Sequence, residues 1–159
     1  MSVDQATFRS VLGRFASGVT VVTVREGEID HGMTASAFCS LSLDPPLALV
    51  CIERSTRMHE LLMRVDRYAV NMLASHQEAL SRRFAEPPDD TRFDGVGFDR
   101  GNTGAPLIRD VLAHLECELV DRYPGGDHTI IVGRVIAATA AADSRPLLYY
   151  RGGYAALER

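Results

Sequence analysis

Four polar, glycine-bearing segments carry the side chains that could bind a ligand or do chemistry. The first runs from Gly32 to Ser42, where small residues and hydroxyls alternate just before Asp44-Pro-Pro46. Small side chains let a flat ligand approach the backbone, and hydroxyls and amides can donate to its heteroatoms. An edge strand with a polar outer face explains the same pattern equally well, because strands favour Thr and alternation.

The second segment, Cys51 to Arg57, is a buried strand that runs into the start of a helix. Ser55 and Thr56 are natural N-caps, and the free amides of a helix start can bind an anion. Arg57 adds positive charge. A cap with no ligand is the simpler interpretation of an isolated Ser-Thr pair, so an anion site requires a second segment that converges there.

The other two segments lie in the second half of the chain. In Tyr123-Pro-Gly-Gly-Asp-His128, two glycines suit a turn, and Asp127 sits beside His128 at the start of a strand. A lone histidine is more often structural than functional, but one beside a carboxylate can orient a ligand. In Tyr149-Tyr-Arg-Gly-Gly-Tyr154, aromatics and an arginine can grip a nucleotide. The same residues could equally be a tail that packs on the fold.

Several chemistries have no supporting motif. The chain contains no GxSxG, P-loop, HExxH or GxGxxG motif, and the five histidines lie far apart. A net charge of -4 with scattered basic residues argues against nucleic acid as a partner. The residues therefore favour binding of a planar cofactor, without a metal, over nucleophilic catalysis by the protein.

The start of the chain and its cysteines bear on location. We expect a cytoplasmic protein with no membrane association, because no signal peptide is visible and no apolar run could span a bilayer. Cys39, Cys51 and Cys117 lie in apolar surroundings, so we expect them to be buried, reduced and structural.

Periodicity predicts a mainly β protein with a few helices. The spacing of Phe8, Val11, Leu12 and Phe15 predicts a helix that Gly18 ends. Further helices are expected over residues 56–64 and, from a capping box formed by Ser75 and Glu78, to about residue 84. Strands are expected over residues 19–24, 30–35, 47–52, 68–73, 113–122, 129–138 and 147–150, with a long loop over residues 86–105. Many close strands without βα alternation indicate one barrel or sandwich domain over residues 1–159.

Taken in order, these segments resemble the flavin reductase-like family, whose members have an FMN-binding split barrel. The resemblance spans nearly the whole chain. The segments that carry it are the opening helix with Phe15-Ala-Ser-Gly-Val-Thr-Val-Val-Thr23, Gly32-Met-Thr-Ala-Ser-Ala-Phe38, the Pro-Pro pair, Cys51 to Ser55, Phe84-Ala85, Gly126-Asp-His128 and Arg151-Gly-Gly-Tyr154. It implies a homodimeric Greek-key split β-barrel with flanking helices and a flavin near the subunit interface.

The resemblance also implies roles for residues by position. Thr34, Ala35, Ser36 and Ala37 would line the isoalloxazine edge, with Cys51, Ile52 and Glu53 below it. Ser55, Thr56 and Arg57 would meet the phosphate, and Phe84 and Ala85 would lie near the phosphate or adenine end. Asp127 and His128 match the nicotinamide-side motif, with His128 as the catalytic candidate, and Arg151 and Tyr154 would cover that nucleotide.

The implied activity is NAD(P)H-dependent reduction of FAD or FMN, with NADH preferred, to supply free reduced flavin to a partner monooxygenase. The alternatives are a non-catalytic flavin carrier or sensor, a pyridoxamine-phosphate oxidase-like or haem-degrading enzyme on the same barrel, and a purely structural domain. Gly126-Asp-His128 and Arg151-Gly-Gly-Tyr154 argue against another enzyme on this barrel. A structural domain leaves the four polar segments unexplained.

Overall fold

The barrel begins with a run of β-branched residues. In the computed structural model, which describes residues 1–158, Thr20–Glu26 forms strand β2, and its first five residues are all buried. A strand covered on both faces requires such a run, because alternate side chains point to opposite faces. Gly27 has a φ of 62°, and from this turn the chain returns as β3 (Ile29–Ala35).

The remaining elements follow in chain order. The N-terminal part comprises α1 (Gln5–Leu12) and β1 (Ser17–Gly18), and β3 is followed by β4 (Phe38–Ser42), β5 (Leu47–Glu53), α2 (Arg57–Leu62), β6 (Arg67–Met72), the 3-10 turn η1 (Ser75–Gln77) and α3 (Glu78–Ala85). The second half comprises β7 (Phe98–Arg100), β8 (Pro106–Ile108), β9 (Ala113–Gly125), β10 (His128–Ala140), β11 (Leu147–Tyr150) and β12 (Gly153–Ala156).

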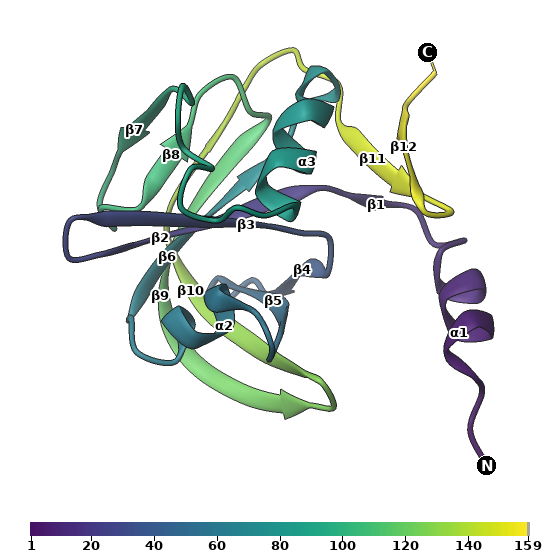
Figure 1. The fold of residues 1–159 in the computed structure, drawn as a ribbon. Helices are drawn as coiled ribbons and strands as arrows, with labels where there is room; N and C mark the ends of the chain where they lie inside the picture. Colours follow the sequence, from purple (N-terminus) through teal and green to yellow (C-terminus); the bar gives the residue numbers. More distant parts are fainter. Residues whose placement is uncertain (159) are drawn as a thin grey trace.

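Seven strands form one antiparallel sheet in the order β3-β2-β6-β9-β10-β5-β4. Its two edge strands, β3 and β4, follow each other in the chain and are joined only by Ser36 and Ala37. The sheet must therefore curl until its two edges meet, which makes it a barrel split between β3 and β4 (Figure 1). The expected Greek-key split barrel is confirmed.

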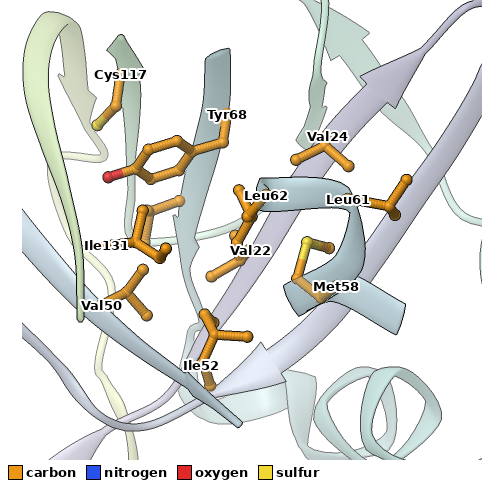
Figure 2. Close-up of a cluster of buried hydrophobic side chains, with 12 residues drawn as sticks. Val22, Val24, Val50, Ile52, Met58, Leu61, Leu62, Tyr68, Cys117 and Ile131 are labelled. Carbon is orange, nitrogen blue, oxygen red and sulfur yellow. The ribbon is translucent and has the colours of Figure 1, made fainter. Parts of the chain in front are cut away.

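An apolar cluster fills the barrel. Figure 2 shows Tyr68, Cys117, Ile131, Val22 and Ile52 gathered in this cluster. Three side chains from α2 pack against the same cluster. These three, Met58, Leu61 and Leu62, are at most 3% exposed. The short helix therefore covers one end of the core.

A second apolar cluster lies on the outer face of β2 and β6, under α3 and the β7–β8 hairpin. Buried Asn71 ties that hairpin to the sheet, since its amide donates to the Val21 carbonyl and accepts from the Ile108 amide, at 3.0 and 2.8 Å. Thr23 adds a bond of 2.7 Å to the Pro106 carbonyl. The segment after α3 is thereby fixed against the barrel.

Some local expectations were wrong. The N-terminal helix ends at Leu12 with Gly13 as its C-cap, and Gly18 instead belongs to β1. Ser75 does not cap α3, because it opens η1, where the Gln77 side chain accepts a bond from the Ala74 amide. The expected loop over residues 86–105 contains β7, which pairs with β8.

The cysteine expectation holds only in part, although all three thiols are free. Cys117 is buried, but Cys51 is half-buried and Cys39 is exposed. Cys39 lies on β4, an edge strand of the sheet, where a side chain can point away from the core.

The contact between α3 and β3 depends on the absence of a side chain at Gly32. A Cβ there would lie 2.6 and 2.8 Å from Cε1 and Cδ1 of Phe84, which is fully buried and also packs edge-on against Phe93. Because Phe84 cannot swing into solvent, a methyl group at position 32 must push α3 away from the strand.

We predict that Gly32→Ala lowers the free energy of unfolding by about 1 to 3 kcal/mol, the usual cost of overpacking. Urea unfolding of the variant and of wild type measures it. Gly97→Ala is the matched control, because a Cβ there meets only the flexible Arg109 side chain, no closer than 3.4 Å. Equal losses in the two variants would contradict the account.

Candidate functional site

A cavity of about 230 Å³ lies between β3, α3 and the C-terminal hairpin. We call it the hydroxyl cavity, and it is lined by Val19, Thr34, Ser36, Ser81, Ala85, Tyr149 and Tyr154. Thr34, Ser36, Ala85 and Tyr154 are among the sequence-predicted site residues, and they come from three distant parts of the chain. The structure therefore brings the first and fourth polar segments together.

Hydrogen bonds hold the walls of the hydroxyl cavity in place. The Thr34 hydroxyl donates to the Ser81 carbonyl at 2.6 Å, and the Ser81 hydroxyl bonds the Tyr154 hydroxyl at 2.7 Å. The Arg82 guanidinium stacks over the Tyr154 ring at 4.9 Å, and Tyr149 packs edge-on against the same ring. The C-terminal hairpin is thus attached to α3, and its two tyrosine rings form an aromatic wall of the cavity.

A second cavity of about 230 Å³ lies at the other side of the α3 C-terminus. We call it the cationic cavity, and it is lined by His31, Gly32, Met33, Ser55, Thr56, Arg57, Met58, Ala85, Asp89 and Arg92. Ala85 lines both cavities, so the two cavities are neighbours on either side of this residue. An open hollow of about 660 Å³ adjoins the cationic cavity and shares Ser55, Thr56, Arg57 and Asp89 with it.

At the strand-to-helix turn, the Thr56 hydroxyl that was expected to meet an anion instead bonds within the turn. α2 has only six residues, and its cap hydroxyl on Thr56 accepts from the His59 amide and donates to the Glu53 carbonyl. The Thr56 hydroxyl therefore holds the turn itself. Within residues 1–158, the Ser55 and Arg57 side chains make no hydrogen bond to protein, which leaves them available to a ligand.

Buried Arg92 joins the loop after α3 to the cationic cavity. Its guanidinium donates to the Gly32 carbonyl at 2.9 Å and to the Glu86 carbonyl, and it pairs with Asp89 at 2.8 Å. Sequence reasoning missed Arg92 and Asp89, and also His31, Met33 and Ser81. Alternation along β3 could have indicated His31 and Met33, but nothing local marks Arg92 as buried.

Asp127 and His128 form the tip of the β9–β10 hairpin. His128 Nδ1 bonds the Asp127 carboxylate at 2.7 Å, and this bond lowers the pKa of Asp127. His128 lies opposite Glu53 in the sheet, and the Arg54 amide donates to the Asp127 carbonyl at 2.9 Å. The pair therefore lies beside the Ser55 turn, but it lines neither cavity within this chain.

Several other predicted site residues have side chains that are buried in the protein. Phe84 and Ile52 are fully buried, so their side chains cannot touch a ligand, and Phe84 instead positions Ala85. Ala35 is buried too, and the Ala37 carbonyl accepts from the Cys51 amide at 2.9 Å. Ala37 itself is exposed, and Cys51 is half-buried.

Arg151 lies at the tip of the β11–β12 turn, outside both cavities. It adopts a φ of 52°, its side chain is exposed, and its amide donates to the Gly13 carbonyl at 2.8 Å. Its backbone therefore ties the C-terminal hairpin to the end of α1.

Two further features concern metal ions and membrane-spanning helices. Residues 1–158 contain no group of three or more His, Cys, Asp or Glu side chains placed to hold a metal ion. In the same part of the chain, no helix has the length and apolar character needed to cross a bilayer.

Comparison with known proteins identifies the family. The family model described as flavin reductase like domain matches residues 12–158. The solved structure of an NADH:FAD oxidoreductase from Streptomyces globisporus C-1027, in complex with NAD and FAD fragments, is 42% identical with a TM-score of 0.93. The match covers 98% of this chain and 93% of the oxidoreductase chain.

Two curated relatives are similar over most of their length. The reductase component of 4-hydroxyphenylacetate 3-monooxygenase from Thermus thermophilus is 40% identical, over 92% of this chain and 93% of that protein. The reductase subunit of a flavin-dependent monooxygenase from Rhodococcus jostii is 36% identical, over 99% and 80%. With a family match over almost its whole length and relatives at this identity, the chain belongs to the flavin reductase-like family.

Proposed function

We propose that this protein uses NADH to reduce FAD or FMN and supplies the reduced flavin to a flavin-dependent monooxygenase component. Its relatives are reductase components of such systems or NADH-dependent reductases of FAD. The observation in this structure that carries the proposal is the pair of cavities that share Ala85. One accepts a flat polar ring and the other a phosphate, the two ends of a flavin nucleotide.

The isoalloxazine ring would lie along the hydroxyl cavity. Its edge would meet Thr34 to Ala37, and the backbone of Cys51 to Glu53 would lie below. Backbone amides and the free Ser36 hydroxyl would then stabilise negative charge at the pyrimidine edge. The Thr34 hydroxyl would act indirectly, because its proton already goes to the Ser81 carbonyl.

The flavin phosphate would lie in the cationic cavity, where Ser55 and Arg57 have unused donors. Charge-assisted hydrogen bonds of this kind are the strong ones. The adjoining open hollow has room for the adenosine half of FAD, so the site is open to both FAD and FMN.

When bound, the flavin supplies the hydride acceptor and NADH supplies the donor. The protein's contribution is to hold the two rings in contact, since no side chain in the hydroxyl cavity has to exchange a proton. His128, oriented by Asp127, would position the nicotinamide nucleotide, and Tyr154 with Arg151 would cover it.

We predict that His128→Ala lowers NADH-dependent turnover about 10-fold or more through loss of positioning, with flavin affinity within about twofold of wild type. NADH oxidation is followed by near-ultraviolet absorbance with FAD or FMN in excess, and affinity by flavin fluorescence. His76→Ala controls for loss of a histidine, because His76 is exposed and lies on η1. Normal turnover in His128→Ala would remove His128 from the mechanism.

A homodimer is the second part of the proposal. α1 extends away from the barrel (Figure 1), and none of its residues is buried. Phe8, Val11 and Leu12 on α1, and Phe15 just beyond its end, are between 51 and 82% exposed. A monomer rarely leaves such a contiguous apolar surface in water. A second copy would cover it, and the family resemblance implies a flavin near the subunit interface.

We predict that the wild type has about twice the 17.4 kDa mass of one chain in light scattering. Val11→Asp should shift the mass toward a single chain, because burying an unpaired carboxylate is costly. Arg9→Asp, also on α1 but outside the apolar set, is the control. A monomeric wild type, or a dimeric Val11→Asp, would overturn the assignment of α1 to the interface.

We further propose that the protein acts in the cytoplasm. Its three free cysteines, one of them exposed, fit a reducing compartment. A non-catalytic flavin carrier or sensor remains the alternative function, and it predicts tight flavin retention with little NADH oxidation.

A further inference from the structure

His31 lies on β3 at the wall of the cationic cavity and has no role in the function proposed above. The cavity joins it to Arg57 at the start of α2 and to Arg92 in the loop after α3. Arg92 already uses most of its donors on the Gly32 and Glu86 carbonyls and on Asp89. The side chains of Arg57 and His31 are therefore the cationic or protonatable groups of this lining that are least committed to protein contacts.

The carboxylates near His31 are each engaged by another arginine. Glu26 on β2 pairs with Arg64, whose Nη2 lies 2.9 Å from it. Asp30, the neighbour of His31 on β3, accepts a bidentate pair from Arg100 at 2.7 and 2.8 Å and lies 3.6 Å from Arg25. Asp89 is paired with Arg92.

The charges around His31 therefore leave an excess of positive charge facing the cavity. Burial lowers the pKa of His31, and Arg57 lowers it further, against weaker opposing effects of Glu26 and Asp30. Arg64 acts in the same direction as Arg57. The imidazole of the free protein is therefore mostly neutral near pH 7, since its pKa lies below the ordinary value of 6.5.

We propose that His31 binds the flavin phosphate in its protonated form, so that flavin binding takes up a proton and the flavin is held more loosely as pH rises. This inference rests on the proposed function, because it requires the phosphate to lie in the cationic cavity. A phosphate beside His31 reverses the local charge balance. The imidazole then gains a proton from solvent and donates an N–H to a phosphate oxygen.

The sign of the effect follows from linkage. The pKa of His31 is higher in the complex than in the free protein, so the extra affinity is fully present below the free-state pKa. It is lost as pH rises through the pKa of the complex. The affinity for a phosphorylated flavin therefore falls as pH rises from mildly acidic to mildly alkaline values.

FAD is the ligand to use, because each phosphorus of its diphosphate has a single, strongly acidic hydroxyl and its charge stays constant over this range. FMN carries a phosphate monoester that itself titrates near pH 6 and would confuse the result. Riboflavin has the same ring without a phosphate. The affinity for FAD and for riboflavin is measured by fluorescence across the pH range with wild type, His31→Gln and the control His76→Gln.

We expect wild type and His76→Gln to lose about tenfold in affinity for FAD across the range, the loss expected for one charge-assisted hydrogen bond. Riboflavin affinity should change by less than about twofold. His31→Gln should bind FAD with a flat pH profile, close to the wild type at high pH and weaker at low pH. A wild-type FAD profile as flat as that for riboflavin, or a His31→Gln profile with the wild-type slope, would overturn the proposal.

Calorimetry with FAD in buffers of different ionisation enthalpy provides a second readout that needs no variant. Wild type should take up a fraction of a proton per FAD near pH 7, and none with riboflavin. Uptake of no proton with FAD would overturn the role of His31 while leaving flavin reduction intact. If neither flavin binds at any pH, the proposed function fails instead, so the two failures are distinguishable.

Discussion

The packing of α3 against β3 is the contact on which the candidate site depends. Gly32 leaves room for the Phe84 ring, and the burial of that ring fixes the last turn of α3 so that Ala85 separates the two cavities. Hydrogen bonds reinforce the contact on both sides, from Thr34 to the Ser81 carbonyl and from Arg92 to the Gly32 carbonyl. A single displacement of α3 would therefore change both the cavity proposed for the isoalloxazine ring and the cavity proposed for the flavin phosphate.

The residues that stabilise the barrel and the residues that line the candidate site lie in different parts of the molecule. Its interior is packed with apolar side chains and covered by α2 (Figure 2), and the two cavities of the candidate site lie outside it, along β3. The cavities there expose hydroxyls, small residues, aromatic rings and arginines, and the titratable His31 and Asp89 lie only in the cationic cavity. Such a surface suits a reaction whose reactive groups belong to the two nucleotides and whose rate depends on how they are placed.

Much of the fold could be predicted from local patterns, because β2 and β10 are rich in β-branched residues, β5 is an apolar run, and the β2–β3 and β9–β10 pairings follow from short connections. The hydroxyl cavity was predicted in part, since Thr34, Ser36 and Tyr154 come together. Tertiary packing decided the rest. Local sequence does not reveal that the side chains of Phe84, Ile52 and Arg92 are buried. Nor does it reveal that the Thr56 hydroxyl donates to the Glu53 carbonyl within its own turn. The exposure of α1 was equally hidden, because an apolar helix face looks the same whether it covers its own chain or another copy.

The central claim is that flavin is reduced at this surface and then leaves it. The most direct test mixes a small amount of protein with excess NADH and FAD without oxygen, filters off the protein, and measures reduced flavin in the filtrate. The account predicts free reduced FAD in many-fold excess over the protein chains. Reduced flavin retained with the protein at no more than one per chain would contradict it and favour a carrier or sensor.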